Sequence, residues 1–288
     1  MIIGIWGEDK SCKSTLALTG DRPIGYMELD LGGYRRATRN VNDNLPIADW
    51  VRDKEIFSVY KDMQGTEHEM RYVMPMQQVD IITATIRPTK ILTGMKELFF
   101  QWLVDYMNLL KMPEEQCRTI VIDTGTLLRT ISSQGYLQEK QELQMMPNGQ
   151  VKPGEKLRVQ LMQQEYREPN DRMRAIFYQA NAYRKNLIIT HHATDKYALM
   201  PGAGGIMQQQ PTGKRKMQGW DGIGDSADII VHTYITAENV PNTNPPKKKI
   251  VPRCEVDLCE VKELEGMKLV EPTIPKLTNM IKMIRGEV

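Results

Sequence analysis

The sequence has few cysteines, and none of them forms a recognisable motif. The four are Cys12, Cys117, Cys254 and Cys259, and no two of them stand in a C-x-x-C pair. Cys254 and Cys259 are five residues apart, so on a β-strand they would point to opposite faces. A disulfide framework or a thiolate zinc site is therefore disfavoured, and we expect free, reduced thiols.

The sequence also lacks a long hydrophobic run and an excess of charge of either sign. No apolar stretch approaches the roughly 20 residues that a membrane-spanning helix needs. The first residues read as a strand, without the basic segment of a signal peptide, so we expect a cytoplasmic protein with no membrane partner. The formal net charge is only +2, so any affinity for nucleic acid must come from local basic patches.

The rest of the composition is that of an ordinary globular protein. Of the 288 residues, 41% are hydrophobic and 26% are charged, and a chain of this length can bury a sizeable core. No internal repeat or linker stands out. We therefore expect one domain over residues 1–288, in which residues 34–90 elaborate the core.

The most informative motif lies at the amino end. A short apolar run, residues 1–6, leads into a polar loop and then a helix-compatible stretch, which is the context of a phosphate-binding P-loop. Backbone N–H groups of such a loop point into one anion-sized hollow. Lys13 is expected to reach the β- and γ-phosphates, the Ser14 hydroxyl to ligate Mg²⁺, and Thr15 to bond the α-phosphate. The predicted nucleotide-binding residues are Gly7, Glu8, Asp9, Lys10, Ser11, Cys12, Lys13, Ser14 and Thr15.

One position departs from the pattern G-x-x-x-x-G-K-[ST]. Cys12 stands where the second glycine belongs, and its Cβ is expected to crowd a loop that must approach phosphate closely. A plain strand, turn and helix is the alternative interpretation. A further hypothesis is that the helix N-terminus lowers the pKa of the Cys12 thiol, which would make nucleotide binding sensitive to oxidation.

Two further strand-like runs end in acidic residues. Residues 24–30 end in Glu28 and Asp30, and the β-branched run 118–123 closes on Asp123. In a parallel α/β sheet, groups at the carboxyl ends of strands meet the ligand. Asp123 therefore suits a Walker B carboxylate that reaches the Mg²⁺ shell. Either Glu28 or Asp30 could orient or deprotonate an attacking water, and an acidic loop cap is the alternative for both.

A third apolar strand is expected over residues 186–192, ending in two histidines. We assign a γ-phosphate-sensing role to His192 rather than His191, with a structural histidine as the alternative. Residues 194–219 are rich in Gly, Gln and Lys, which predicts a mobile basic loop that orders on a polyanion, or else a plain disordered loop. Its basic candidates for DNA binding are Lys196, Lys214, Arg215 and Lys216.

Amphipathic patterns predict helices over residues 96–110 and from Asn170 or Asp171 to about Lys185. The expected buried positions are Leu98, Trp102, Tyr106 and Leu109 in the first helix and Met173, Ile176, Phe177 and Ala180 in the second. Residues 56–60 and 70–74 suggest an added hairpin. Residues 225–233 and 256–261 suggest two late strands, and the tail after residue 271 ends in a short helix.

Taken in order, these motifs resemble the RecA-like branch of P-loop ATPases. The order is P-loop, strand ending in acid, strand ending in Asp123, strand ending in Thr190-His191-His192, and a Gly-rich basic loop. More narrowly, the chain is similar to the core-only phage RecA-like ATPases linked to single-strand annealing and recombination. The resemblance implies an α/β fold with a mostly parallel central sheet flanked by helices and an antiparallel hairpin at the carboxyl end.

The resemblance also implies roles for single residues. Lys13 and Ser14 bind phosphate and Mg²⁺, Asp123 supports the metal, Asp30 is the general base, and His192 links the γ-phosphate to a DNA-binding loop. That loop corresponds to residues 194–219, and a first DNA-binding loop corresponds to the polar segment 132–153. Arg253 and Lys262 are candidates for a residue that acts across a subunit boundary.

The function implied is an ATPase whose turnover is coupled to single-stranded DNA in phage recombination, annealing or repair. ATP and Mg²⁺ are the implied ligands, and the implied partners are single-stranded DNA, further copies of the chain in a ring or filament, and a single-strand-binding protein. A phage-encoded protein of this kind would act in the host cytoplasm. Two alternatives stay open: a helicase-like or packaging motor, and a nucleotide-binding scaffold without turnover.

Overall fold

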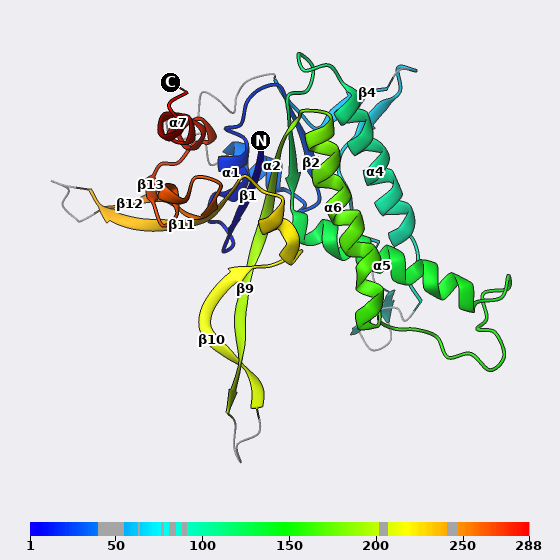
Figure 1. The fold of residues 1–288 in the computed structure, drawn as a ribbon. Helices are drawn as coiled ribbons and strands as arrows, with labels where there is room; N and C mark the ends of the chain where they lie inside the picture. The colour runs from blue at the N-terminus through cyan, green and yellow to red at the C-terminus, as the bar shows by residue number, and fades with distance from the viewer. Residues whose placement is uncertain are drawn as a thin grey trace.

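A central β-sheet organises the chain. The computed structural model describes residues 1–39, 55–62, 64–75, 78–80, 85–87, 91–201, 207–240 and 247–287. Within these residues the sheet has nine strands, eight of them in the order β13-β12-β11-β1-β9-β8-β2-β3, with β10 paired to β9 (Figure 1). The parallel strands are β1 (Ile2–Gly7), β2 (Ile24–Glu28), β3 (Ile56–Phe57), β8 (Thr119–Asp123), β9 (Asn186–Pro201) and β11 (Ile229–Asn239). The antiparallel strands are β10 (Met207–Met217), β12 (Lys248–Cys259) and β13 (Lys268–Val270).

Helices cover both faces of this sheet. Figure 1 shows α4 (Met95–Lys111), α5 (Gly125–Gln144) and α6 (Arg167–Ala182) gathered on one side of it. The opposite side carries α1 (Lys13–Ala17), α2 (Gly33–Arg39) and α7 (Ile274–Arg285). None of the described helices is long and apolar enough to cross a bilayer. The predicted α/β class is confirmed, with a mostly parallel sheet between helices and antiparallel strands at the carboxyl end.

The alternation of side chains along the strands explains why both faces are covered. Ile2 and Trp6 of β1 pack in the core under α4, α5 and α6. Ile3 and Ile5 pack in the second core, with α1 and α7. Because successive side chains of a strand point to opposite faces, a strand buried on both sides reads as a continuous apolar run. The apolar runs that predicted β1, β2, β8 and β9 have this origin.

The two predicted amphipathic helices are present. Trp102, Tyr106 and Leu109 of α4 are fully buried, whereas Leu98 is only partly buried against the same core. The four residues predicted for the inner face of α6 are all buried. The predicted start of α6 is wrong, because the helix begins at Arg167 after Tyr166 rather than at Asn170 or Asp171. Pro169 lies in the first turn of α6, where proline is tolerated because its missing N–H has no intrahelical partner.

Two segments that were expected to be loops contain regular structure. The polar segment 132–153 begins as helix, since α5 runs to Gln144, and Met145 then bridges Val151. Its Leu, Gln, Glu and Lys residues are strong helix formers, which the loop assignment overlooked. In the basic segment 194–219, β9 continues to Pro201 and pairs antiparallel with β10. We call residues 193–201 and 207–217 the β9–β10 ribbon, which projects away from the sheet (Figure 1).

The elaboration of the core after α2 is small in its described part. β3 extends the sheet beside β2, and β4 (Val59–Lys61) pairs with β5 (Glu67–Glu69), which shortens the predicted hairpin. A second small pair joins β6 (Gln78–Asp80) and β7 (Thr85–Arg87). Residues 40–54 of the predicted elaboration lie outside the described residues.

The cysteines of β12 do not face opposite sides of the sheet. Cys254 and Cys259 are both buried in the same core cluster. The pairing of β12 with β11 shifts between Ile230 and Val231, which leaves one extra residue in β12 at this point. Such a bulge reverses the alternation of a strand, and this explains why simple period-two reasoning failed here. All four cysteines are free thiols, as expected.

Candidate functional site

The predicted chemistry gathers at the carboxyl edge of the sheet. Gly7 at the end of β1 lies beside His192 of β9, and Asp123 at the end of β8 lies beside Glu28 of β2. β9 runs between β1 and β8 in the strand order. His192 therefore stands between Asp123 and residues 7–15, the predicted P-loop, which is called the P-loop below. Residues that are up to 185 positions apart in sequence are therefore brought to one place by strand pairing alone.

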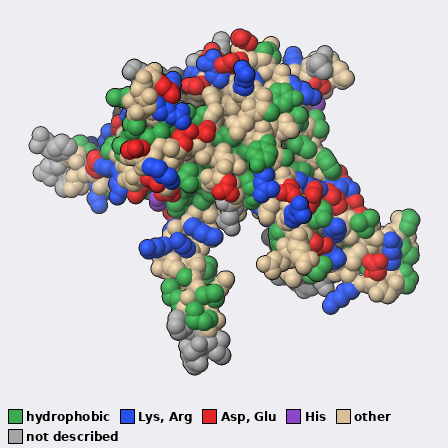
Figure 2. Space-filling model, viewed as in Figure 1, with side chains coloured by type: hydrophobic (Ala, Val, Ile, Leu, Met, Phe, Trp, Pro, Cys, Tyr) green, Lys and Arg blue, Asp and Glu red, His purple; other side chains and the backbone are tan. Residues whose placement is uncertain are grey.

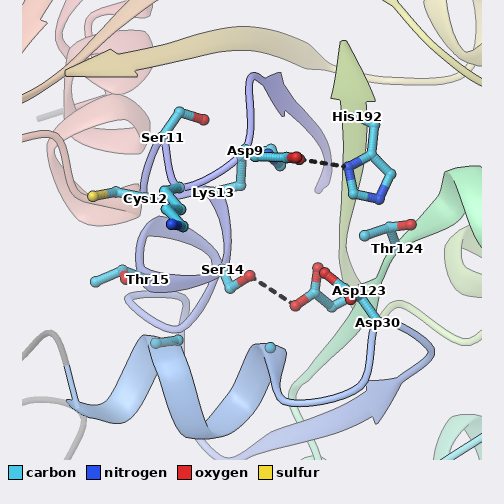
Figure 3. A pocket seen from close by; sticks show the side chains of 13 residues that line it. Asp9, Ser11, Cys12, Lys13, Ser14, Thr15, Asp30, Asp123, Thr124 and His192 are labelled. Atoms are coloured by element: carbon cyan, nitrogen blue, oxygen red, sulfur yellow. Dashed lines mark hydrogen bonds and ion pairs between the residues drawn. The ribbon is translucent and has the colours of Figure 1, made fainter.

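A cavity of about 370 Å³ lies at this edge. That volume is within the range of small-molecule binding sites. Figure 3 shows side chains from the P-loop on one side of it, and on the other side Asp30 from the loop after β2, Asp123 from the end of β8 and His192 from β9. The lining residues are Asp9, Lys10, Ser11, Cys12, Lys13, Ser14, Thr15, Asp30, Gly33, Ala37, Asp123, Thr124 and His192.

The P-loop wraps closely around the Lys13 side chain. The Lys13 ammonium donates to the carbonyl of Gly7 at 3.0 Å and to that of Glu8 at 2.7 Å, and the residue is only 8% exposed. Burial lowers the pKa of Lys13, although the nearby Asp123, Asp9, Asp30 and Glu8 oppose the shift. A Cβ at Gly7 would lie 2.3 Å from the carbonyl oxygen of Thr233, so the loop can begin only with glycine.

Cys12 adopts a backbone conformation that normally favours glycine. Its φ of 67° lies in the left-handed region, which a residue with a Cβ tolerates poorly. The loop thus keeps its turn at a local cost. The hypothesis of a reactive thiol is wrong in its premise, because burial raises the pKa of Cys12 more than Lys13 lowers it. The helix that follows has only five residues, so its dipole adds little and the loop amides dominate.

The Asp123 carboxylate accepts hydrogen bonds from three neighbouring elements. Its Oδ2 accepts hydrogen bonds from the Ser14 hydroxyl, at 2.7 Å, and from the Tyr26 hydroxyl. Its Oδ1 accepts one from the Thr190 hydroxyl. Burial, followed by the charge of Asp123, raises the pKa of Tyr26 well above its usual value, so the hydroxyl stays a donor. Asp123 itself is 1% exposed, and its carboxylate is therefore fixed by neighbours from three other elements.

The structure separates the two acidic candidates at the carboxyl end of β2. The Glu28 carboxylate accepts from the backbone N–H groups of Gly32, at 2.9 Å, and Tyr34, at 3.2 Å, and it lies 3.6 Å from Arg71. It therefore caps the loop that leads into α2. Asp30 lines the cavity and lies beside Asp123 in Figure 3. Of the two positions left open by the sequence, only Asp30 faces the place where a ligand would bind.

The two histidines at the end of β9 differ in their surroundings. His191 is 1% exposed, and its Nδ1 lies 3.0 Å from the carbonyl of Gln218 at the base of β10. Burial lowers the pKa of His191 to about 4, so the ring is neutral. His192 lines the cavity, and its Nδ1 lies 3.5 Å from the Asp9 carboxylate. His192 is thus placed to contact a ligand, whereas His191 has a structural role.

The predicted basic residues lie on the β9–β10 ribbon, but they are not equivalent. Lys196, Lys214 and Lys216 are exposed. In Figure 2, basic side chains gather where the ribbon leaves the body of the molecule. Arg215 is exposed as well, and it forms ion pairs with Glu8 of the P-loop and with Asp195 of β9. The side chains of Arg253 and Lys262, which were candidates for action across a subunit boundary, pair with Glu238 and Glu265.

The oxygen donors at this edge fit a hard divalent cation. The Ser14 hydroxyl and the carboxylates of Asp123 and Asp30 converge on one wall of the cavity (Figure 3). Within the described residues no cluster of three or more His, Cys, Asp or Glu side chains could hold a metal alone. The hydroxyl of Ser14 and the carboxylates of Asp123 and Asp30 suit Mg²⁺. This ion is bound through one or two carboxylates and completes its shell with water and phosphate oxygens.

Sequence reasoning missed several residues of the site. Tyr26 and Thr190 were assigned only to strands, although both donate to Asp123. Thr126 bonds the carbonyl of Gln218 and the backbone N–H of His192, which joins α5 to the base of the ribbon. Their positions next to predicted strand ends were the available signal, but the partner across the sheet could not be read from the sequence.

Comparisons with known proteins add little to these observations. No protein-family profile matches the chain, and no curated protein matches it in sequence. Among solved structures, the chain is similar to the crystal structure of a KaiC-like protein from the hyperthermophilic archaeon Pyrococcus horikoshii. That match covers 93% of this chain and 84% of the other, with 9% identity and a TM-score of 0.40. A match this weak carries no argument, so the fold assignment rests on the strand order and register.

Gly33 offers a test of the packing around Asp123. A Cβ at this position would lie 2.6 Å from Asp123 Oδ2 and 3.1 Å from the Tyr26 hydroxyl. Gly33→Ala should therefore displace Asp123 and lower the affinity for a magnesium nucleotide by roughly 10- to 100-fold, as changes beside a metal ligand do. The control is Gly224→Ala, whose Cβ would have Leu258 as its nearest neighbour at 3.8 Å. Isothermal titration measures the affinity of each variant and of the wild type. A Gly33→Ala variant that binds as tightly as the wild type and the control would contradict this packing.

The buried, neutral His191 should make the free energy of unfolding fall at acid pH. Its folded-state pKa of about 4 lies below the ordinary value of 6.5, so its contribution to stability is complete above about pH 6.5 and is lost as the pH falls toward 4. The full loss is about 3 kcal/mol. Urea unfolding of the wild type and His191→Gln across this range should show a steeper fall for the wild type. Parallel curves would show that His191 does not titrate in this way.

Proposed function

We propose that this chain binds ATP with Mg²⁺ at the carboxyl edge of its sheet and hydrolyses it. The observation that carries the proposal is the contact between Ser14 and Asp123, at 2.7 Å, beside a buried lysine in a P-loop. A hydroxyl from the P-loop and a carboxylate from the end of another strand are the pair that P-loop enzymes use to hold the metal. Their convergence is more specific than the sequence motif, which lacks its second glycine.

Each residue has a chemical task in this proposal. Lys13 leaves the carbonyls of Gly7 and Glu8 and neutralises the β- and γ-phosphates. Ser14 and Asp123 would hold the Mg²⁺, which would draw charge from the phosphate oxygens when bound. Asp30 orients the attacking water, and its carboxylate accepts the proton. His192 lies near enough to the P-loop acid Asp9 to respond to a charge placed in the cavity.

The finer proposal is that the β9–β10 ribbon binds single-stranded DNA. Support comes from its exposed lysines and from the continuity of β9, which passes from the cavity wall at His192 directly into the ribbon. Lysines along a two-stranded ribbon contact phosphates without reading bases, so binding should be salt-dependent and tolerant of sequence. The chain would then act as a RecA-type ATPase in phage recombination or annealing, in a ring or filament with a single-strand-binding protein nearby.

Lys13→Ala tests the hydrolytic site. Loss of the ammonium removes the charge that faces the phosphates, so phosphate release should fall by roughly 100- to 1,000-fold, as it does when one stabilising donor is lost. Lys111→Ala, at the exposed end of α4, is the control for charge. Phosphate release is measured with and without single-stranded DNA. Turnover by the variant at the wild-type rate would remove the P-loop from the proposal, whereas ATP binding without release by the wild type would favour a scaffold.

The ribbon lysines test the DNA-binding proposal. The triple variant Lys196→Ala, Lys214→Ala, Lys216→Ala should weaken binding to oligothymidylate and reduce the slope of log affinity against log salt by about two. The matched control changes three exposed lysines elsewhere, Lys61, Lys111 and Lys268, and leaves the net charge equal. Fluorescence anisotropy at several salt concentrations measures both. Identical slopes in the two triple variants would place the DNA elsewhere.

A further inference from the structure

Arg215 ties the ribbon to the P-loop through a contact that spans 207 residues of sequence. Its Nε and Nη2 donate to the two carboxylate oxygens of Glu8, at 2.5 Å and 2.8 Å. Its Nη1 donates to Asp195 on the neighbouring strand, at 2.6 Å. The side-on, two-bond contact with Glu8 is the geometry in which a guanidinium also binds a phosphate.

Glu8 takes part in a second contact through its backbone. Its carbonyl accepts from the Lys13 ammonium at 2.7 Å and from the backbone N–H of Ser11 at 3.2 Å. One residue therefore holds the arginine of the ribbon with its side chain and the lysine of the phosphate loop with its main chain. Glu8 is thus the residue at which the phosphate loop and the ribbon meet.

The ion pairs of Arg215 are exposed to water, so another anion can displace the carboxylates from it. Glu8, Asp195 and Arg215 are all substantially exposed, with side-chain exposures of 54%, 52% and 42%. Exposed ion pairs are weak, so a phosphate group that arrives at Arg215 can compete with the carboxylates. While the pairs persist, the single positive charge of Arg215 faces the two negative charges of Glu8 and Asp195 and is not offered to a polyanion.

We propose that Glu8 is a positioning residue which couples the occupancy of the phosphate loop to the binding of polyanions by the ribbon. The inference rests on the proposed function, because it assigns the route by which the two sites of that function communicate. A triphosphate draws Lys13 away from the Glu8 carbonyl, which loosens the hold of Glu8 on Arg215. Arg215 is then released to bind phosphates of the nucleic acid.

Thermodynamic linkage requires that the coupling between the two ligands be reciprocal. If a nucleotide raises the affinity for nucleic acid, nucleic acid must raise the affinity for nucleotide by the same factor. In the wild type we expect a non-hydrolysable ATP analogue with Mg²⁺ to raise the affinity for oligothymidylate about tenfold, a typical coupling. In Glu8→Gln the affinity should be high without nucleotide, and the ratio should fall below about twofold.

Asp195→Asn is the matched control for this experiment. It removes the same negative charge from Arg215 but leaves the contact with the P-loop intact. The variant should therefore bind oligothymidylate more tightly than the wild type and keep the full nucleotide ratio. Equal ratios in wild type, Glu8→Gln and Asp195→Asn would overturn the inference, and so would a ratio lost in both variants.

A second measurement does not depend on nucleic acid. Hydrogen exchange at the amides of the β9–β10 ribbon should change when the ATP analogue binds to the wild type, and it should not change in Glu8→Gln. If the analogue binds to the wild type and leaves the exchange of the ribbon unaltered, the coupling is wrong while the ATPase proposal stands. If isothermal titration shows that the wild type binds no nucleotide, both fall together.

Discussion

The buried carboxylate of Asp123 is the constraint on which the arrangement of this site depends. It receives hydroxyl groups from the P-loop, from β2 and from β9, and it lies against the start of α2 at Gly33. A carboxylate removed from water is stable only when such donors surround it. The four elements must therefore meet at one position, and their meeting defines the cavity into which Lys13 and Asp30 project.

The elements closest to Asp123 could be predicted from the sequence, because local patterns encode them. Strands buried on both faces produce unbroken apolar runs, and polar residues at their ends mark the ligand side of the sheet. These patterns were enough to predict the strands β1, β8 and β9. They also placed Lys13, Ser14, Asp123 and His192 close to the carboxyl ends of these strands. The predicted stripe on α4 was also sound, since a helix packed on one side repeats its apolar residues regularly.

The rest of the site depends on pairings between distant residues, which local patterns do not record. The bulge in β12 changes the facing of Cys259 without any mark in its composition. The ribbon has a polar, glycine-containing sequence typical of a loop, and it forms strands because β9 is already fixed in the sheet and provides a template. The contacts of Arg215 with Glu8 and of Tyr26 with Asp123 depend on the strand order, and no feature near these residues announces them.

The length of β9 has a mechanical consequence. The same strand passes between β1 and β8 in the core and continues for nine residues beyond His192 as one side of the ribbon. At about 3.3 Å per residue, this outer part is a lever roughly 30 Å long. A tilt of about 5° at its root would displace its far end by roughly 3 Å. An atomic-scale rearrangement beside the P-loop would in this way become a movement comparable to the rise between stacked bases.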